Sequence, residues 1–334
     1  MRDKKIKSCI TFAWYLAASL FGSGSLKADS SSTYPPISIP FEAESVDAEN
    51  VYYFAGHSGV PGPENEGFTA NSGFVITEKG VVVFDALGTP SLGFEMIAKI
   101  REMTALPITH VVISHYHADH VYGLQAFKDH TEAEVIAQES SVAYIQSPDA
   151  DRRLEQRSVA LSPWVDDKTR LIAPDLTFDE TTTLESGSFR FTILHAGPAH
   201  APDDSLMMVE PAGVLFSGDI IQNGRVPFLA SSEVDTANWM TAIDEVRALE
   251  PEILVPGHGR ASGNAMAALD FTYDYLSFVR EKMGDAVKQW LQFEEAYEQT
   301  DWSRYANLPA FDASNKANAY RVYLEMEKEA LEGN

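Results

Sequence analysis

The chain has 334 residues, with 49 acidic against 25 basic side chains and a formal net charge of −24 at pH 7. Such an excess of negative charge repels nucleic-acid backbones and anionic membrane surfaces, because only clustered Lys or Arg can neutralise them. Nucleic acid is therefore not an expected partner, whereas a small-molecule substrate is. The length is ample for an extensive hydrophobic core.

The N-terminus carries a targeting pattern. A basic stretch, MRDKKIK, precedes the apolar run CITFAWYLAASLFG, and small and polar residues follow. Small residues interrupt the run before the ~20 apolar positions that a transmembrane helix needs, so residues 1–28 are predicted to be a secretory signal peptide. We expect a periplasmic or secreted protein without stable membrane insertion after cleavage, and an extended lead-in over 29–45. The single cysteine, Cys9, lies in the signal segment, so no disulfide is expected in the mature chain.

From residue 50 onward, short β-branched runs are bounded by Gly, Pro, Asn or Asp, which is typical of strands. Apolar residues recur at helical spacing over 91–104, 118–128 and 236–249. Residues 140–170 contain few core signals, and the sequence leaves open whether they form a helical insertion or a loop that covers a pocket. The expected strands are 51–54, 73–77, 81–84, 111–113, 135–137, 189–194, 205–210, 214–216 and 253–255.

This order of elements predicts the α/β class, with layers of sheet and helix. After residue 262, apolar residues lie mainly three, four or seven positions apart, which indicates helices. We therefore expect a catalytic domain over 46–262 and a helical C-terminal extension over 263–334 that packs on it.

The stretch SHYHADH, residues 114–120, directly follows an apolar strand and contains three histidines and an aspartate. Clustered neutral imidazoles beside a carboxylate are donors that divalent metal ions bind. His115 and His117 are two positions apart at the strand end, so they project to the same side and can reach one ion. Asp119 and His120 follow the turn and can reach a second ion beside the first.

Further ligands should come from the carboxyl ends of other strands, where open α/β sheets place their sites. Three residues meet this condition, since each follows an apolar strand and lies among Gly, Pro or Ser: His200, Asp219 and His258. Three other histidines are interpreted as structural: His110, His130 and His195.

The joint pattern of H-x-H-x-D-H, a distant His, a Gly-Asp and a final Gly-His resembles the metallo-β-lactamase superfamily over residues 50–260. The resemblance implies an αββα sandwich that holds two divalent metal ions at one edge, with zinc expected and iron or manganese as alternatives. The implied ligands are His115, His117 and His200 for the first ion, Asp119, His120 and His258 for the second, and Asp219 as the bridge.

Two adjacent metal ions can lower the pKa of a bridging water to about 7 and can polarise a carbonyl group. The expected activity is therefore that of an exported binuclear hydrolase, whose bridging hydroxide attacks an activated carbonyl of a thioester, lactone, ester or lactam. Asp119 is the expected catalytic residue, which positions the hydroxide and passes its proton to the leaving group.

The ligand set also bears on the branch of the superfamily. Two lactamase classes use a cysteine where this chain has Asp219, and the third lacks the bridging aspartate. Five His and two Asp instead resemble the set of glyoxalase II and lactonases. The motifs GPAHAPDD, VLFSGDII, GRVPFL and NAYRVYLEME resemble periplasmic zinc metallohydrolases found with sulfur-oxidation and quinoprotein-relay systems.

Arg225, in GRVPFL, could bind an anionic substrate group near the metal ions or form a surface ion pair with one of the many acids. The other expected substrate residues are His57, Tyr116, Asn223 and Phe228.

Two other functions remain open. Persulfide dioxygenases resemble this superfamily and use one iron with the same motif, and nitrogen and carboxylate ligands suit iron as well as zinc. A non-catalytic periplasmic metal-binding accessory protein is the second alternative. The complete ligand set favours the enzyme, because degenerate members usually lose a ligand.

Overall fold

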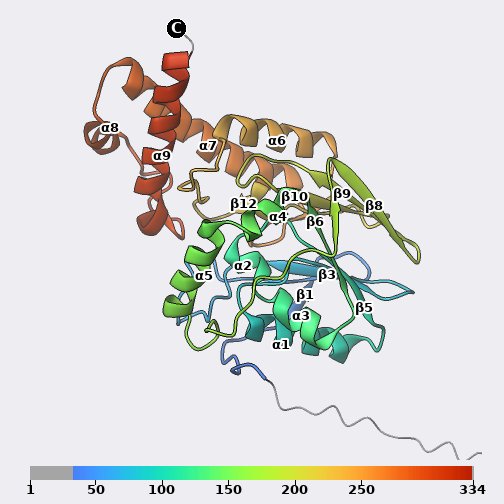
Figure 1. Cartoon of the computed structure of the whole chain (residues 1–334). Coiled ribbons are helices and arrows are strands. Elements are labelled where there is room, and N and C mark those ends of the chain that lie inside the picture. The colour runs from blue at the N-terminus through green and yellow to red at the C-terminus, as the bar shows by residue number, and fades with distance from the viewer. Residues whose placement is uncertain (1–32, 333–334) are drawn as a thin grey trace, which may run out of the picture. The chain divides into compact units, whose positions relative to one another are not determined.

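Two β-sheets form the middle of the fold in the computed structural model, which describes residues 33–332 (Figure 1). In spatial order the first sheet contains β1 (Ala43–Ser45), β2 (Val51–Phe54), β3 (Ser72–Ile76), β4 (Val81–Phe84), β5 (Ile108–Val112), β6 (Glu134–Gln138) and β7 (Leu176–Phe178). The second contains β13 (Ile253–Val255), β11 (Val214–Phe216), β10 (Ser205–Glu210), β9 (Phe189–His195) and β8 (Thr181–Ser186). A short ribbon pairs β12 (Gln222–Asn223) with β14 (His258–Gly259).

Helices cover the outer faces of both sheets (Figure 1). The helices are α1 (Pro90–Met103), α2 (Ala118–Val121), α3 (Leu124–His130), α4 (Ser141–Ile145), α5 (Pro148–Ala160), α6 (Thr236–Ala248), α7 (Ala265–Lys288), α8 (Phe293–Gln299) and α9 (Phe311–Glu332). Apolar side chains of α1 and α3 pack on the first sheet, those of α6 and α7 share a core with the second sheet, and α9 packs on α7. The layer order is therefore αββα, as the resemblance implies.

Alternation along the strands produces these layers. In β4, Val81 and Val83 contact the core under α1, while Val82 and Phe84 face the second sheet. This follows from the strand period of two, which sends successive side chains to opposite faces. A fully apolar strand such as VVVF can therefore supply two cores at once, and all four of its residues are buried.

Local signals fix where several helices begin. The side chain of Thr89 accepts a hydrogen bond from the Leu92 amide, and Pro90 occupies the first helical position of α1. Ser147 caps α5 in the same way, again directly before a proline. A capping carboxylate or amide starts α6 and α7.

The sequence-based elements are largely confirmed, with differences. The expected helix over 118–128 is two helices, α2 and α3. The expected strand over 111–113 is Ile108–Val112. Residues 140–170 contain α4 and α5 followed by an irregular segment, and β7 and β8 were not expected because their exposed, Thr- and Glu-rich strands lack an apolar run.

The predicted signal peptide, with Cys9 and the first part of the lead-in, lies outside the described residues. From Tyr34 onward the described residues form one compact unit. Within it, no helix combines the length and apolar character that a membrane crossing requires.

Gly73 in β3 lies against the second sheet, where a side chain would have no room. A methyl group added at Gly73 would overlap the ring of Phe216 in β11, which faces it across the inter-sheet core. Overpacking of this kind costs about 1–3 kcal/mol. We expect Gly73→Ala to lower the free energy of unfolding by this amount in urea denaturation. Gly263→Ala is the matched control, because its added methyl would meet nothing within 4 Å, and an equal loss in both variants would contradict the argument.

Candidate metal centre

The carboxyl ends of five strands converge at one end of the two sheets. β4 and β5 are parallel neighbours, so their carboxyl ends share an edge of the first sheet. In the second sheet, β10 is antiparallel to both β9 and β11, and β11 is parallel to β13, so β9, β11 and β13 all end on one side. The amide of Ser205 donates to the carbonyl of Ser114 at 2.7 Å and links the two edges.

The seven predicted ligands follow these strand ends and meet in the interior. Three groups have ligand atoms that all lie within 4.8 Å of one another: His115, His117 and His200; His115, His120 and Asp219; and Asp119, His120 and His258. Residues from four separate parts of the chain are thus brought together, in the two sets that the resemblance implies.

Asp219 lies between the two sets. Its Oδ1 is 3.3 Å from His120 Nε2, and its Oδ2 is 3.4 Å from His200 Nε2 and 3.3 Å from His258 Nε2. The carboxylate therefore faces histidines of both sets. Gly257 makes this possible, because a side chain at that position would collide with the Asp219 carboxylate.

The chemistry of the donor set fits metal ions. Within residues 33–332, the buried atoms His115 Nε2, His120 Nε2 and Asp219 Oδ1 have no hydrogen-bond partner. Leaving such atoms unsatisfied is costly, and native proteins rarely do so. Imidazole nitrogens and a carboxylate oxygen that converge without partners are a donor set for divalent cations such as zinc.

In two of the predicted ligands, a backbone carbonyl holds the ring nitrogen opposite Nε2. His258 Nδ1 donates to the Thr69 carbonyl at 2.8 Å, and His200 Nδ1 donates to the Phe228 carbonyl at 3.2 Å. Because a carbonyl only accepts, these bonds place the proton on Nδ1 and leave the Nε2 lone pair for a metal ion.

For His120, the partner of the ring nitrogen Nδ1 is the carboxylate of Asp85. Its Oδ2 lies 2.7 Å from His120 Nδ1, and its Oδ1 accepts the Ser114 amide at 2.8 Å. Asp85 is buried and directly follows β4. It therefore orients one ligand and ties it to the strand end that carries another.

Burial also sets the protonation of the cluster. Burial lowers the pKa of His115, His117 and His200, so these imidazoles stay neutral, as ligands must. Burial opposes ionisation of Asp219, but His258 and His120 outweigh it and hold the Asp219 pKa well below its usual range. His120 is the exception: burial opposes its protonation, but Asp85 and Asp219 outweigh burial and raise its pKa well above the usual range, so a metal ion at its Nε2 would displace a proton.

A cavity of about 260 Å³ opens onto the cluster. His117, Asp119, His200, Asp219 and His258 line it, so ligands of both sets face the same space.

The predicted substrate residues are placed differently from one another. Arg225 and Phe228 line this cavity. Tyr116 lines an adjoining cavity of about 250 Å³, where its hydroxyl donates to the Ile172 carbonyl. His57 is exposed, and Asn223 donates to the Arg260 carbonyl. Neither is among the residues that line the two cavities.

Arg225 is buried, with 5% of its surface exposed, and within residues 33–332 it makes no ion pair or hydrogen bond. The alternative that it forms a surface ion pair is therefore wrong.

Helix α9 fixes the loop that carries Arg225 and Phe228. Asn318 of α9 donates to the Pro227 carbonyl at 2.7 Å and accepts the Leu229 amide at 2.8 Å. These two bonds flank Phe228, whose carbonyl oxygen bonds to His200. The C-terminal helical region thus contacts the loop that orients a metal ligand.

Sequence reasoning missed Asp85 and the arginines of α5. Asp85 follows an apolar strand, as Asp219 does, so the rule that found Asp219 would have found it too. Arg153 and Arg157 also line the metal-site cavity. No sequence pattern distinguishes these two arginines, because α5 is polar and Ala150 is its only buried residue.

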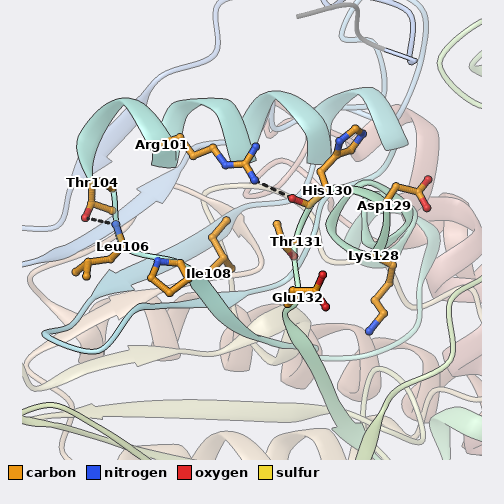
Figure 2. Close-up of a pocket in the computed structure, with 11 residues that line it drawn as sticks. Arg101, Thr104, Leu106, Ile108, Lys128, Asp129, His130, Thr131 and Glu132 are labelled. Carbon is orange, nitrogen blue, oxygen red and sulfur yellow. Dashed lines mark hydrogen bonds between the residues drawn. The ribbon is translucent and has the colours of Figure 1, made fainter. Parts of the chain in front are cut away.

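A larger hollow of about 780 Å³ lies away from these ligands, where α1 and α3 end beside β5 (Figure 2). There, Arg101 Nη2 donates to the His130 carbonyl at 2.7 Å. None of the seven ligands lines it. We therefore assign the chemistry to the smaller cavity.

Asp85→Asn tests the support of His120. The amide removes the carboxylate that holds His120 Nδ1–H, and changes of this kind typically lower metal affinity about 10- to 100-fold. We expect such a loss in zinc competition with a chromophoric chelator. Asp129→Asn, which alters a carboxylate paired on the surface with Arg170, is the control, and equal affinities in the two variants would contradict the role of Asp85.

Comparisons with known proteins agree with this geometry. Residues 65–258 match the profile of the Metallo-beta-lactamase superfamily. A linear primary-alkylsulfatase of Pseudomonas sp. (strain ATCC 19151) is 22% identical over 238 residues, which are 61% of this chain but only 44% of that protein. A metallo-beta-lactamase type 2 of Bacillus sp. (strain 170) is 22% identical over 59% of this chain and 69% of its own length.

Solved structures share the fold. The metallo-beta-lactamase from Pontibacter korlensis superposes with a TM-score of 0.57 at 18% identity, covering 71% of this chain and 99% of its own. The family profile covers more than half of the chain and includes all seven ligands. The chain therefore belongs to the metallo-beta-lactamase superfamily.

Proposed function

We propose that this protein is a binuclear metal-dependent hydrolase that cleaves an activated carbonyl compound, such as a thioester, lactone, ester or lactam. The observation that carries the proposal is the pair of three-ligand groups that face one cavity, with Asp219 between them. When bound, two zinc ions would supply a hydroxide nucleophile and polarise the carbonyl under attack.

The residues divide into holding and proton-handling roles. His115, His117 and His200 would hold one ion, and Asp119, His120 and His258 the other, with Asp219 between them. Burial opposes ionisation of Asp119, but His120 and His258 lower its pKa, so it is ionised at neutral pH. Its Oδ2 accepts a hydrogen bond from the Thr69 hydroxyl at 3.3 Å. Asp119 lines the cavity, which suits a group that orients the nucleophile and passes a proton to the leaving group.

A mononuclear iron persulfide dioxygenase is the first alternative. It would use one iron with the same H-x-H-x-D-H motif, so the metal content separates it from the hydrolase. Asp119, His120 and His258 form a second group of potential ligands beside the first, as two ions would require. A non-catalytic accessory protein is less well supported, because ligands and cavity are both retained.

Export to the periplasm or the exterior is part of the proposal. It rests on the N-terminal sequence, whose basic and apolar segments are typical of a signal peptide.

Metal content is the first test. Plasma mass spectrometry on mature protein, purified without added metal or chelator, should give about two zinc ions per chain. Removal of the metal by chelation should abolish hydrolysis of thioester, lactone and lactam panels, and added zinc should restore it. About one iron per chain, with oxygen consumption on a persulfide substrate, would contradict the proposal and support the dioxygenase.

Asp119→Asn separates metal binding from proton transfer. We expect kcat to fall about 10²- to 10⁴-fold, because the amide cannot accept the proton. Metal content and circular dichroism of the variant should be measured alongside, with Asp167→Asn, at an exposed position, as the control. A variant that keeps both ions and the wild-type rate would exclude Asp119 as the proton carrier.

A further inference from the structure

Three arginines line the cavity over the metal ligands. Arg153 and Arg157 come from α5, and Arg225 comes from the loop after β12. Arg153 and Arg157 are four positions apart, so they lie on one face of the helix. Both are half-buried, while Arg225 is almost fully buried.

These arginines differ from the others in having no partner. Within residues 33–332, the side chains of Arg153, Arg157 and Arg225 make no ion pair or hydrogen bond, although the chain has 49 acidic residues. Every other arginine in that range has an acidic or carbonyl partner. Arg152, directly beside Arg153, pairs with Asp149.

Arg225 shows why a ligand is needed. Its Nε and Nη1 are buried without a partner, and a guanidinium remains charged under these conditions. Burial lowers the Arg225 pKa, and the carboxylates of Asp219 and Asp119 oppose that effect. Both carboxylates belong to the predicted metal ligands, so bound cations would neutralise their negative charge. The counter-charge of Arg225 must then come from another molecule.

The charge of the loaded cavity leads to the same conclusion. Two divalent ions and three guanidinium groups would outweigh the two ligand carboxylates, in a chain whose net charge is −24. A desolvated site with this balance attracts anions. The planar fork of arginine matches carboxylate, sulfate and phosphate oxygens in a bidentate manner, which lysine cannot do.

We infer that Arg153, Arg157 and Arg225 form an oxyanion-binding wall, and that the substrate carries a carboxylate, sulfate or phosphate group next to the bond that is cleaved. The inference rests on the proposed function, because the wall and the metal ligands share one cavity. With about 260 Å³ available, the anionic end of the substrate is small. Hydrogen bonds of the next residues hold the backbone beside Arg225 in place. The Val226 amide donates to the Pro309 carbonyl, and Asn318 donates to the Pro227 carbonyl.

Binding of plain oxyanions tests the wall without turnover. Isothermal titration of zinc-loaded protein with succinate, sulfate and phosphate should give an affinity that falls about 10-fold or more in Arg225→Gln and in the double variant Arg153→Gln/Arg157→Gln. Arg152→Gln is the matched control and should bind as the wild type does. Zinc content and circular dichroism are measured for each variant, and Arg225→Lys, which keeps the charge, should recover part of the affinity.

Affinities that are unchanged in all arginine variants, and that fall only when zinc is removed, would overturn the inference, because the anions would then bind the metal alone. The anion that binds most tightly indicates which group the substrate carries: a carboxylate, a sulfate or a phosphate.

Turnover separates this inference from the proposed function. The mono-S-phenyl thioester of succinic acid and S-phenyl thiobutyrate have acyl chains of the same length. The first ends in a carboxylate where the second ends in a methyl group. We expect the wild type and Arg152→Gln to prefer the charged ester by about 10-fold or more in kcat/KM, and the wall variants to lose the preference. Equal rates on both thioesters would contradict an oxyanion-binding role of the three arginines but would still support the proposed hydrolase activity.

Anion binding without hydrolysis of any carbonyl compound would reject the proposed function and leave the wall standing. Hydrolysis of p-nitrophenyl sulfate or p-nitrophenyl phosphate instead of the thioesters would support the wall and assign the oxyanion itself as the reacting group.

Discussion

The burial of five imidazoles and two carboxylates in one small volume is the constraint on which the rest of the molecule depends. Burying such groups is costly unless they pair with one another or coordinate a metal ion. The fold meets this condition by ending five strands at the same place, so that each ligand leaves a rigid sheet edge and needs only a short loop. Glycines at the Gly-Asp and Gly-His turns keep these loops close together, as the contact between Gly257 and Asp219 illustrates.

The ligands could be predicted from the sequence because their chemistry is local. His115 and His117 share a strand end, and Asp219 and His258 each follow an apolar run beside glycine, so strand and ligand are visible in the same short stretch. The α/β class could be predicted from the order of strands and helices, whereas the αββα layer order was implied by the resemblance. Asp85 also directly follows an apolar strand, so the same reasoning would have selected it.

The remainder of the site depends on tertiary placement, which no short stretch records. Helix α5 has a single buried residue, so its pattern resembles any solvated helix, and only the fold brings Arg153 and Arg157 to the cavity. Arg225 was ambiguous from the sequence because an abundance of acids suggests an ion pair. Burial decides the question, and burial is a property of how the loop after β12 packs against α9 and not of its composition.

The bond between Asn318 and the loop around Phe228 has a consequence for the C-terminal helices. Helix α9 restrains the loop whose carbonyl orients His200, so the free energy of metal binding and the local stability of α9 are linked. Thermodynamic linkage is reciprocal: to the degree that the helix favours the metal-ready imidazole, a bound metal ion favours the docked helix. A metal ion held by His200 would in this way stabilise the docked α9, although the helical region supplies no ligand.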